Sequence, residues 1–353
     1  MSEFKAAVIG TGGIANRHAG YYVDSDRVDL VAGCDISEER LNTYCDKYDI
    51  EGRYSDHQQM LDEVKPDIVS VCTWNPTHMQ LSMDAMQAGA KAVISEKPMG
   101  DDLGGPMDAV AMAEDLGCYF VIGHQTRFSA GHNAVKKLLA DGAIGWPVTV
   151  NIRSGGGMLN MASHLVDNMR WILGDPDWEF VVGWIQRETN RFERGSYCEE
   201  MTHALIRFEG GNEMTLSLDM EDGVKNQEHQ FVGPDGVISF NREQATLLDA
   251  DGKHEPVAIE QPGYFEELLA WMDGGPVHRN VASQALQAQQ ILMAIYESAI
   301  HNTRVEPPFE KRESPLAEAI VAGELPYEGE PYDIRIQEAL DYAIETGEVD
   351  PCP

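Results

Sequence analysis

A glycine-rich turn close to the start of the chain constrains its fold more than any other feature. The segment GTGGIA at residues 10–15 follows an apolar run, Ala6–Ile9, and precedes a helical pattern. When G-x-G-x-x-A stands between a strand and a helix, its glycines permit a tight turn and let backbone N–H groups approach a pyrophosphate. We therefore expect a dinucleotide to bind at Gly10, Gly12, Gly13 and Ile14.

Apolar runs alternate with helical patterns through the first third of the chain. The runs are largely continuous in their apolar character, which is typical of parallel strands that are buried on both faces. They lie at Ala6–Ile9, Leu30–Cys34, Ile68–Cys72, Ala92–Ile94 and Tyr119–Ile122. This alternation predicts a doubly wound α/β domain, a Rossmann dinucleotide-binding fold, over residues 1–125.

Asp35 bears on the choice of cofactor. It ends the second apolar run, about 20 residues beyond the glycine-rich turn, where an acid accepts hydrogen bonds from the ribose 2′-hydroxyl and repels a 2′-phosphate. The alternative is that Asp35 caps the helix predicted over Ser37–Tyr48, although Ser37 already suits that role. The spacing favours NAD as the cofactor, with NADP disfavoured.

The charge balance excludes several classes of partner. The chain has 59 acidic and 26 basic residues, which gives a net charge of −33. Such a field repels nucleic acids and anionic membranes, and no apolar stretch approaches the roughly 18 residues of a spanning helix. We expect a cytoplasmic protein that binds neither nucleic acid nor membrane. A source in concentrated salt and a moderately acidic cytosolic enzyme both fit this balance.

The six cysteines show neither C-x-x-C pairs nor the histidine spacing of a zinc site. Most of them lie in apolar runs, as buried free thiols do in a reducing compartment. The sequence therefore predicts neither a disulfide framework nor a metal site.

Several further segments lie in an order that is found in a known family. TWNPTH at 73–78 and SEKP at 95–98 follow two of the predicted strands. GHQTRF at 123–128, LLADGAIG at 138–145 and GGGMLNMASHLVD at 155–167 come later. With the glycine-rich turn, these segments resemble the family of glucose–fructose oxidoreductase, inositol dehydrogenase and MocA over about residues 4–308. The resemblance implies an NAD-dependent dehydrogenase that oxidises a secondary hydroxyl of a sugar, cyclitol or related polyol.

Ligands of open α/β sheets bind beyond the carboxyl ends of the strands. The polar residues expected there, next to the cofactor, are Thr73, Asn75, His78, Glu96 and Lys97. Lys97 is also the first candidate catalytic residue, because an ammonium group there stabilises the charge that develops on the substrate oxygen. The alternatives are a surface lysine for Lys97 and a helix-surface position for His78 and for His18.

The second motif places polar residues on one predicted helical face. Asn160, His164, Asp167 and Trp171 fall at i, i+4, i+7 and i+11. His164 is the second candidate catalytic residue, because its ordinary pKa is close to neutrality and it can take the hydroxyl proton as a base. We expect Asn160 and Asp167 to bind substrate, although an ion pair with Arg170 would explain Asp167 equally well.

Asn160 departs from the family pattern, which usually has an aspartate four residues before the histidine. An amide binds a substrate hydroxyl but does not stabilise an imidazolium as a carboxylate does. NAD-assisted, redox-neutral cleavage of a glycoside therefore stays open as an alternative, as does a non-catalytic dinucleotide sensor. Gln125, at the end of the last predicted strand of the first domain, is expected to line the cleft. Arg127 either binds substrate or ties the domains together.

The pattern changes to antiparallel strands in the second domain, which we place at residues 126–308. Strands are predicted at Val148–Arg153, Glu179–Gln186, Ala204–Phe208, Met214–Leu218, Glu228–Val232 and Gly236–Phe240. Helices over Tyr264–Met272 and Ser283–His301 are predicted to cover this sheet. An open sheet face of this size commonly packs against a copy of itself, and the resemblance implies a homodimer or homotetramer.

The last segment, residues 309–353, lies outside the resemblance. It holds 12 acidic residues against 3 basic ones and five prolines. This composition predicts an acidic extension that wraps the body, with one short helix near Ile334–Ile344.

Overall fold

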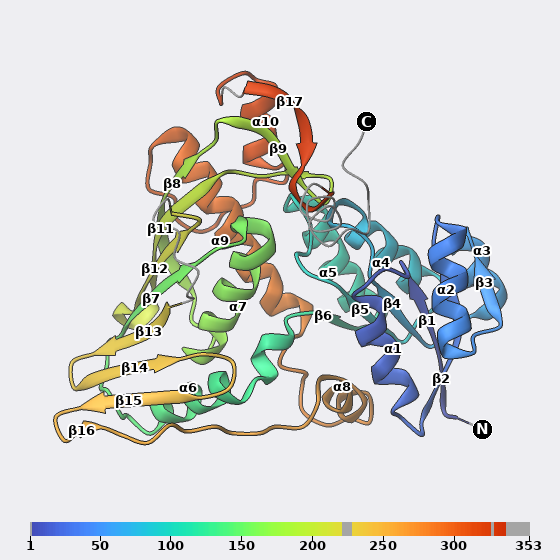
Figure 1. Cartoon of the computed structure of the whole chain (residues 1–353), viewed down its shortest axis with the longest axis horizontal. Coiled ribbons are helices and arrows are strands. Elements are labelled where there is room, and N and C mark those ends of the chain that lie inside the picture. Colours follow the sequence, from blue (N-terminus) through green and yellow to red (C-terminus); the bar gives the residue numbers. More distant parts are fainter. Residues whose placement is uncertain (1, 221–227, 326–327, 337–353) are drawn as a thin grey trace, which may run out of the picture.

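The computed structural model describes residues 2–220, 228–325 and 328–336. Within these ranges, the N-terminal sheet has six parallel strands in the order β3-β2-β1-β4-β5-β6 (Figure 1). The strands are β1 (Phe4–Ile9), β2 (Val28–Cys34), β3 (Gly52–Tyr54), β4 (Ile68–Val71), β5 (Ala92–Ser95) and β6 (Tyr119–Ile122). The five predicted strands and the doubly wound order are confirmed, whereas the short and polar β3 was not predicted.

Helices cover both faces of this sheet. They are α1 (Ala15–Val23), α2 (Glu38–Tyr48), α3 (His57–Val64), α4 (His78–Gln87) and α5 (Gly104–Leu116). The α2 helix begins where expected, because the Ser37 side chain accepts a hydrogen bond from the backbone N–H of Arg40 at 3.4 Å. The carboxyl ends of β4 and β5 lead directly into the loops that hold the candidate site.

Helix α8 (Tyr264–Met272) packs against the N-terminal sheet, close to α1 (Figure 1). The prediction that it covers the antiparallel sheet is therefore wrong. Its apolar face joins the same buried cluster as Phe4 and Tyr22, and the rings of Tyr22 and Phe265 meet edge to face at 5.2 Å. The Tyr264 hydroxyl donates to the carbonyl of Ile122 at 3.1 Å. An amphipathic pattern fixes which side of a helix is buried but not which sheet buries it.

The C-terminal sheet has eight described strands in the order β16-β15-β14-β13-β7-β12-β11-β8. Neighbours are antiparallel except β7 and β12, so the mostly antiparallel prediction is confirmed. The strands are β7 (Thr149–Ser154), β8 (Trp178–Gln186), β11 (Met201–Phe208), β12 (Glu213–Leu218), β13 (Glu228–Gly233), β14 (Gly236–Phe240), β15 (Ala245–Asp249) and β16 (Gly252–Lys253). All six predicted strands are present, whereas β15 and β16 were not predicted.

Three helices pack against one face of the C-terminal sheet and form a single buried cluster with it. They are α6 (Ala130–Ala140), α7 (Ser163–Ile172) and α9 (Ala282–His301). Figure 1 shows α7 and α9 on the side of this sheet that faces the N-terminal sheet. The helix that carries His164 therefore lies between the two sheets.

The acidic extension joins a small third sheet. Strand β17 (Glu328–Asp333) pairs in parallel with β9 (Thr189–Glu193), which also pairs with β10 (Ser196–Tyr197) (Figure 1). Before it, α10 (Pro315–Val321) packs beside α9. The predicted helix near Ile334–Ile344 lies mostly outside the described residues.

Three further observations concern the described ranges only. Their cysteines, Cys34, Cys45, Cys72, Cys118 and Cys198, are all free thiols. No helix in these ranges is both long enough and apolar enough to cross a membrane. No group of three or more His, Cys, Asp or Glu side chains there is arranged to hold a metal ion.

Candidate active site

The glycine-rich turn is shaped for a large ligand. Gly10 has φ +88°, and a Cβ there would lie 2.8 Å from the carbonyl carbon of Cys72, so only glycine fits. A Cβ at Gly12 or Gly13 would meet nothing within 4 Å. Ile14, directly before α1, is 38% exposed. Open space beside glycines at a helix N-terminus suits a pyrophosphate, so the residues present fit a dinucleotide.

Asp35 lies beside this turn. One carboxylate oxygen accepts from the Thr11 backbone N–H at 2.7 Å and from the Thr11 hydroxyl at 3.1 Å. The other accepts from the Ser37 backbone N–H at 2.8 Å. Because Ser37 caps α2, the alternative role of Asp35 as the cap is wrong. The carboxylate is instead fixed against the segment where a dinucleotide fits.

His78 joins the loops that follow β4 and β5. Its Nδ1 lies 2.7 Å from the carbonyl oxygen of Pro98, and its Nε2 lies 2.9 Å from that of Thr73. The side chain is buried, which lowers its pKa, so a helix-surface position is wrong. Asn75, in the same loop, is also buried. With both ring nitrogens engaged by the protein, His78 shapes the loops around Lys97.

Glu96 is the centre of a buried polar network. It faces His18 Nε2 at 3.0 Å and accepts from the Gln125 amide at 2.9 Å. Gln125 in turn accepts from Arg17 at 2.6 Å, and His18 also contacts Ser70. Burial alone would raise the pKa of Glu96, but His18 and the nearby Lys97 hold it below its ordinary value. His18 is thus a buried partner of Glu96, and the helix-surface alternative is wrong for it as well.

Lys97 and Asn160 meet between the two domains. The Lys97 ammonium donates to the Asn160 side-chain oxygen at 2.7 Å and to its backbone carbonyl at 3.1 Å. Burial lowers the pKa of Lys97 to about 8. Asn160 belongs to a π-helical segment, Gly157–Ala162, and regular α7 begins only at Ser163. The prediction of one continuous helical face from Asn160 onward is therefore wrong.

A hairpin tip adds a cation that was not predicted. Arg194 and Gly195 form the tight turn between β9 and β10, and Arg194 donates to the Asn160 side-chain oxygen at 3.2 Å. A Cβ at Gly195 would touch Pro76 at 3.6 Å and Trp74 at 3.8 Å, so the tip lies against the loop after β4. The glycine after Arg194 is a sequence signal for this turn. No sequence signal indicated the contact of Arg194 with Asn160.

The extension holds this hairpin in place. The Asp333 carboxylate accepts from the Gly195 backbone N–H at 3.0 Å. Arg335 donates to Glu193 at 2.6 Å, and the Tyr332 hydroxyl lies 2.9 Å from that of Thr189. The extension therefore contacts the hairpin whose tip reaches Asn160.

His164 lies on α7 with its Nδ1 3.4 Å from Nδ1 of His124. Burial lowers its pKa well below the ordinary value, and the positive charge of Lys97 acts in the same direction. This shift favours the neutral imidazole, the form that a base requires. Lys97 and His164 come from segments far apart in sequence, and the charge of Lys97 acts on His164 in the fold.

Asp167 and Arg127 pair with each other. Two parallel hydrogen bonds, at 2.6 and 2.7 Å, join the guanidinium to the carboxylate, and both side chains are only 1% exposed. Asp167 thus contacts Arg127 rather than Arg170, so that alternative is wrong. Arg127 also donates to the backbone carbonyl of Arg279. This geometry supports the alternative in which Arg127 ties parts of the chain together.

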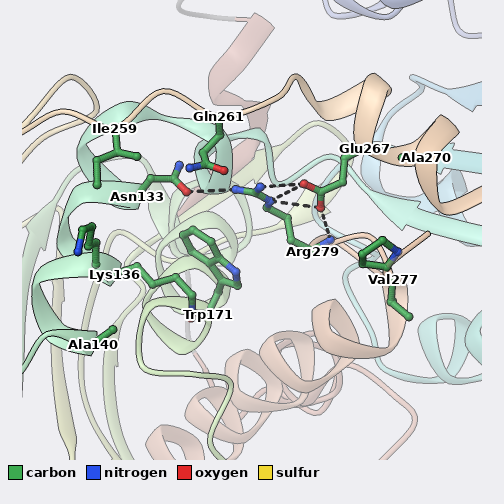
Figure 2. Close-up of a pocket in the computed structure, with 12 residues that line it drawn as sticks. Asn133, Lys136, Ala140, Trp171, Ile259, Gln261, Glu267, Ala270, Val277 and Arg279 are labelled. Carbon is green, nitrogen blue, oxygen red and sulfur yellow. Dashed lines mark hydrogen bonds and ion pairs between the residues drawn. The ribbon is translucent and has the colours of Figure 1, made fainter.

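A pocket of about 540 Å³ lies apart from these residues (Figure 2). Trp171 forms one wall, and Arg279 crosses the pocket to pair with Glu267 at 2.8 Å. Lys136 lies 4.6 Å from the centre of the Trp171 ring and donates to its backbone carbonyl. None of the predicted site residues lines this pocket. Arg279 is already paired with Glu267, and Lys136 with the Trp171 carbonyl. It is not the candidate active site.

A six-stranded parallel sheet with this glycine-rich turn, followed by a mostly antiparallel sheet, is the fold of a two-domain dinucleotide-binding protein. The family described as "Oxidoreductase family, NAD-binding Rossmann fold" matches residues 4–124. The family described as "GFO/IDH/MocA C-terminal domain" matches residues 151–239. The chain belongs to the Gfo/Idh/MocA family of NAD-binding oxidoreductases.

Individual relatives agree with this assignment. D-glucoside 3-dehydrogenase of Escherichia coli is 26% identical over 349 residues, with 86% of this chain and 98% of that protein covered. D-apiose dehydrogenase of Paraburkholderia graminis is 33% identical over 267 residues, with 72% of this chain and 70% of that protein covered. A structure of the WlbA dehydrogenase from Bordetella pertussis with NADH and UDP-GlcNAcA has a TM-score of 0.74 at 22% identity and covers 88% of this chain and 100% of that chain. This last similarity shows the shared fold.

Proposed function

We propose that the protein oxidises a secondary hydroxyl of a sugar, cyclitol or related polyol with NAD. The observation that carries the proposal is that buried Lys97, just beyond the carboxyl end of β5 where ligands of such sheets bind, acts electrostatically on buried His164 of α7. When bound, NAD supplies the acceptor for the hydride. Dehydrogenases of sugars and inositol among the relatives support this substrate class.

Each side chain has a distinct task in this proposal. The Lys97 ammonium donates a hydrogen bond to the substrate hydroxyl oxygen and stabilises the negative charge that develops on it. The neutral His164 takes the hydroxyl proton. Asn160 holds the Lys97 ammonium in place and presents its amide N–H₂ to the substrate. The cofactor-side roles fall to the glycine-rich turn and Asp35.

Incubation of the protein with NAD and a panel of sugars, cyclitols and aryl glycosides tests the proposal. Accumulation of NADH with at least one sugar or cyclitol is the expected result. Release of an aglycone without net NADH would overturn it in favour of redox-neutral glycoside cleavage. Cofactor binding without either product would leave a dinucleotide sensor.

NAD is expected to bind more tightly than NADP, by about 10- to 100-fold in Kd, because a 2′-phosphate would lie against the Asp35 carboxylate. The Asp35→Asn variant keeps a hydrogen-bond acceptor and removes the charge, so it should reduce the difference between the Kd values for NAD and NADP. Titrations of both cofactors into wild type and variant measure the effect. Equal or tighter binding of NADP to the wild type would contradict the assignment.

Turnover is expected to fall as the pH rises through about 8, because the Lys97 ammonium, whose pKa is about 8, is lost there. Asn160→Asp places a carboxylate against this ammonium and raises the pKa of Lys97, so the falling limb should move to higher pH. The carboxylate acts on Lys97 here, since Asn160 contacts Lys97 rather than His164. Profiles of kcat against pH for both proteins measure the shift. Turnover that rises through pH 8 would make neutral Lys97 the base.

We also propose that the protein forms a homodimer or homotetramer through the outer face of the C-terminal sheet. On β8, Val182 and Trp184 are 44% and 48% exposed and lie two residues apart, so they share one face. Large apolar side chains on an open sheet commonly pack against a second copy.

A further inference from the structure

A second cavity, of about 180 Å³, opens beside His164. It lies between α7 and the turn that follows β14, and Met161 and Leu165 form part of its wall. Because a water molecule occupies about 30 Å³ of liquid, this space suits a small organic group. The candidate base therefore borders a cavity that the mechanism above does not use.

Two buried polar atoms of this cavity have no partner in the described protein. The Oδ1 atom of Asn168 and the Oγ1 atom of Thr126 make no hydrogen bond, and Asn168 is only 2% exposed. Buried polar groups in native proteins are almost always hydrogen-bonded, so each such exception needs an explanation. Both side chains line the cavity, and a polar ligand in it would supply the missing partners.

The charges that act on His164, at one side of the cavity, are positive, although the chain as a whole has a net charge of −33. Arg242 lines the cavity and forms no ion pair with any residue that the structure describes. Lys97, Arg17 and Arg242 all act on His164 as positive charges. Glu243 is the acidic side chain of the described lining, and both Glu243 and Arg242 are exposed residues of the turn. An arginine without an ion-pair partner among the described residues, next to the unpaired Thr126 hydroxyl, offers two donors to an anion.

We propose that this cavity binds an anionic group, a carboxylate or a phosphate, carried by the sugar or polyol that is oxidised at Lys97 and His164. Arg242 pairs with the anion and the Thr126 hydroxyl donates to it, while Asn168 Oδ1 accepts from a neighbouring hydroxyl of the same molecule. The substrate class is then a sugar acid or a sugar phosphate. This inference rests on the proposed function for the site of oxidation but not for the binding of the anion.

Binding measurements test the cavity separately from turnover. Calorimetric titration of the NADH complex, in which the proposed oxidation cannot proceed, with D-glucose, D-glucuronate and D-glucose 6-phosphate compares one hexose without an anion, with a carboxylate and with a phosphate. We expect one charged hexose to bind at least about tenfold more tightly than D-glucose. Arg242→Gln should abolish this preference. Lys253→Gln, which removes one positive charge from exposed β16, is the control and should preserve it.

The outcomes distinguish the two proposals. Tighter binding of a charged hexose that depends on Arg242, without NADH formation from any sugar, would support the cavity and overturn the proposed oxidation. NADH formation from neutral sugars, with the charged hexoses bound no better than D-glucose, would overturn the cavity alone. A preference for the anion that survives Arg242→Gln would also overturn it. The carboxylate and phosphate arms identify which anion the cavity selects.

Discussion

Replacing Lys97 or His164 with alanine is expected to lower kcat by about 10²- to 10⁴-fold, with little change in the Kd for NAD. Lys97→Ala removes the ammonium that donates to the Asn160 side chain, and with it the charge proposed to stabilise the developing alkoxide. His164→Ala removes the imidazole proposed to take the proton. Steady-state kinetics with the identified substrate, and a separate NAD titration, measure the two effects.

Matched variants separate chemistry from folding. Lys91 precedes β5 and Lys97 follows it, and the Lys91 side chain is 58% exposed, so Lys91→Ala is the control for lysine. His254, 45% exposed beyond β16, provides the corresponding control for histidine. Both controls should keep near wild-type kcat. Near wild-type turnover in His164→Ala would remove His164 from the mechanism, and the base would then be sought at Lys97.

Asp167→Ala is expected to lower the free energy of unfolding by about 3–5 kcal/mol, because it leaves the Arg127 guanidinium buried without its partner. Arg27 and Asp273 form the same bidentate pair at the surface, with their side chains 34% and 52% exposed. Asp273→Ala is therefore the control and should change stability little. Chemical denaturation of the three proteins measures the difference. A small loss in Asp167→Ala would show that the buried pair is not a stabilising contact.

A double variant decides between a structural and a substrate-binding role for this pair. Replacing Arg127 with Met and Asp167 with Leu removes both charges, and such apolar replacements often restore stability. If the pair is structural, the double variant should recover most of the unfolding free energy that Asp167→Ala loses, and its turnover should be close to that of the wild type. A stable but inactive double variant would assign Asp167 and Arg127 to the substrate site.

The sequence was sufficient for the fold wherever local pattern determines structure. Continuous apolar runs and the glycine-rich turn predicted the N-terminal sheet, because strands buried on both faces must be apolar throughout. The partner of α8 was not predictable, since its amphipathic face fits either sheet. Strand β17, with the sequence EGEPYD, has almost no apolar residues, so its pairing with β9 left no signal in hydrophobicity.

In the candidate site, too, some residues were predictable from the sequence and some contacts were not. Lys97 was predicted because the ends of parallel strands converge at one edge of the sheet, and His164 because of its place in the motif at residues 155–167. Both roles stay predictions. The contact of Asn160 with Lys97 depends on a π-helical segment, and that of Arg194 on a hairpin tip. Both contacts join residues more than 30 positions apart, and neither follows from helical or strand periodicity. Helical spacing pointed to Arg170, at i+3, as a partner of Asp167 and did not indicate its pairing with Arg127.

The parallel pairing of β17 with β9 connects the C-terminal tail to the candidate site. Asp333 and Arg335 fasten the hairpin whose tip meets Asn160, and the positive charge of Arg335 also acts to lower the pKa of Lys97. Substitutions in the tail are therefore expected to reach the candidate site both through the hairpin and through this charge. Divergence of the tail would then change the surroundings of Lys97 and Asn160 without any change in the motifs that carry them.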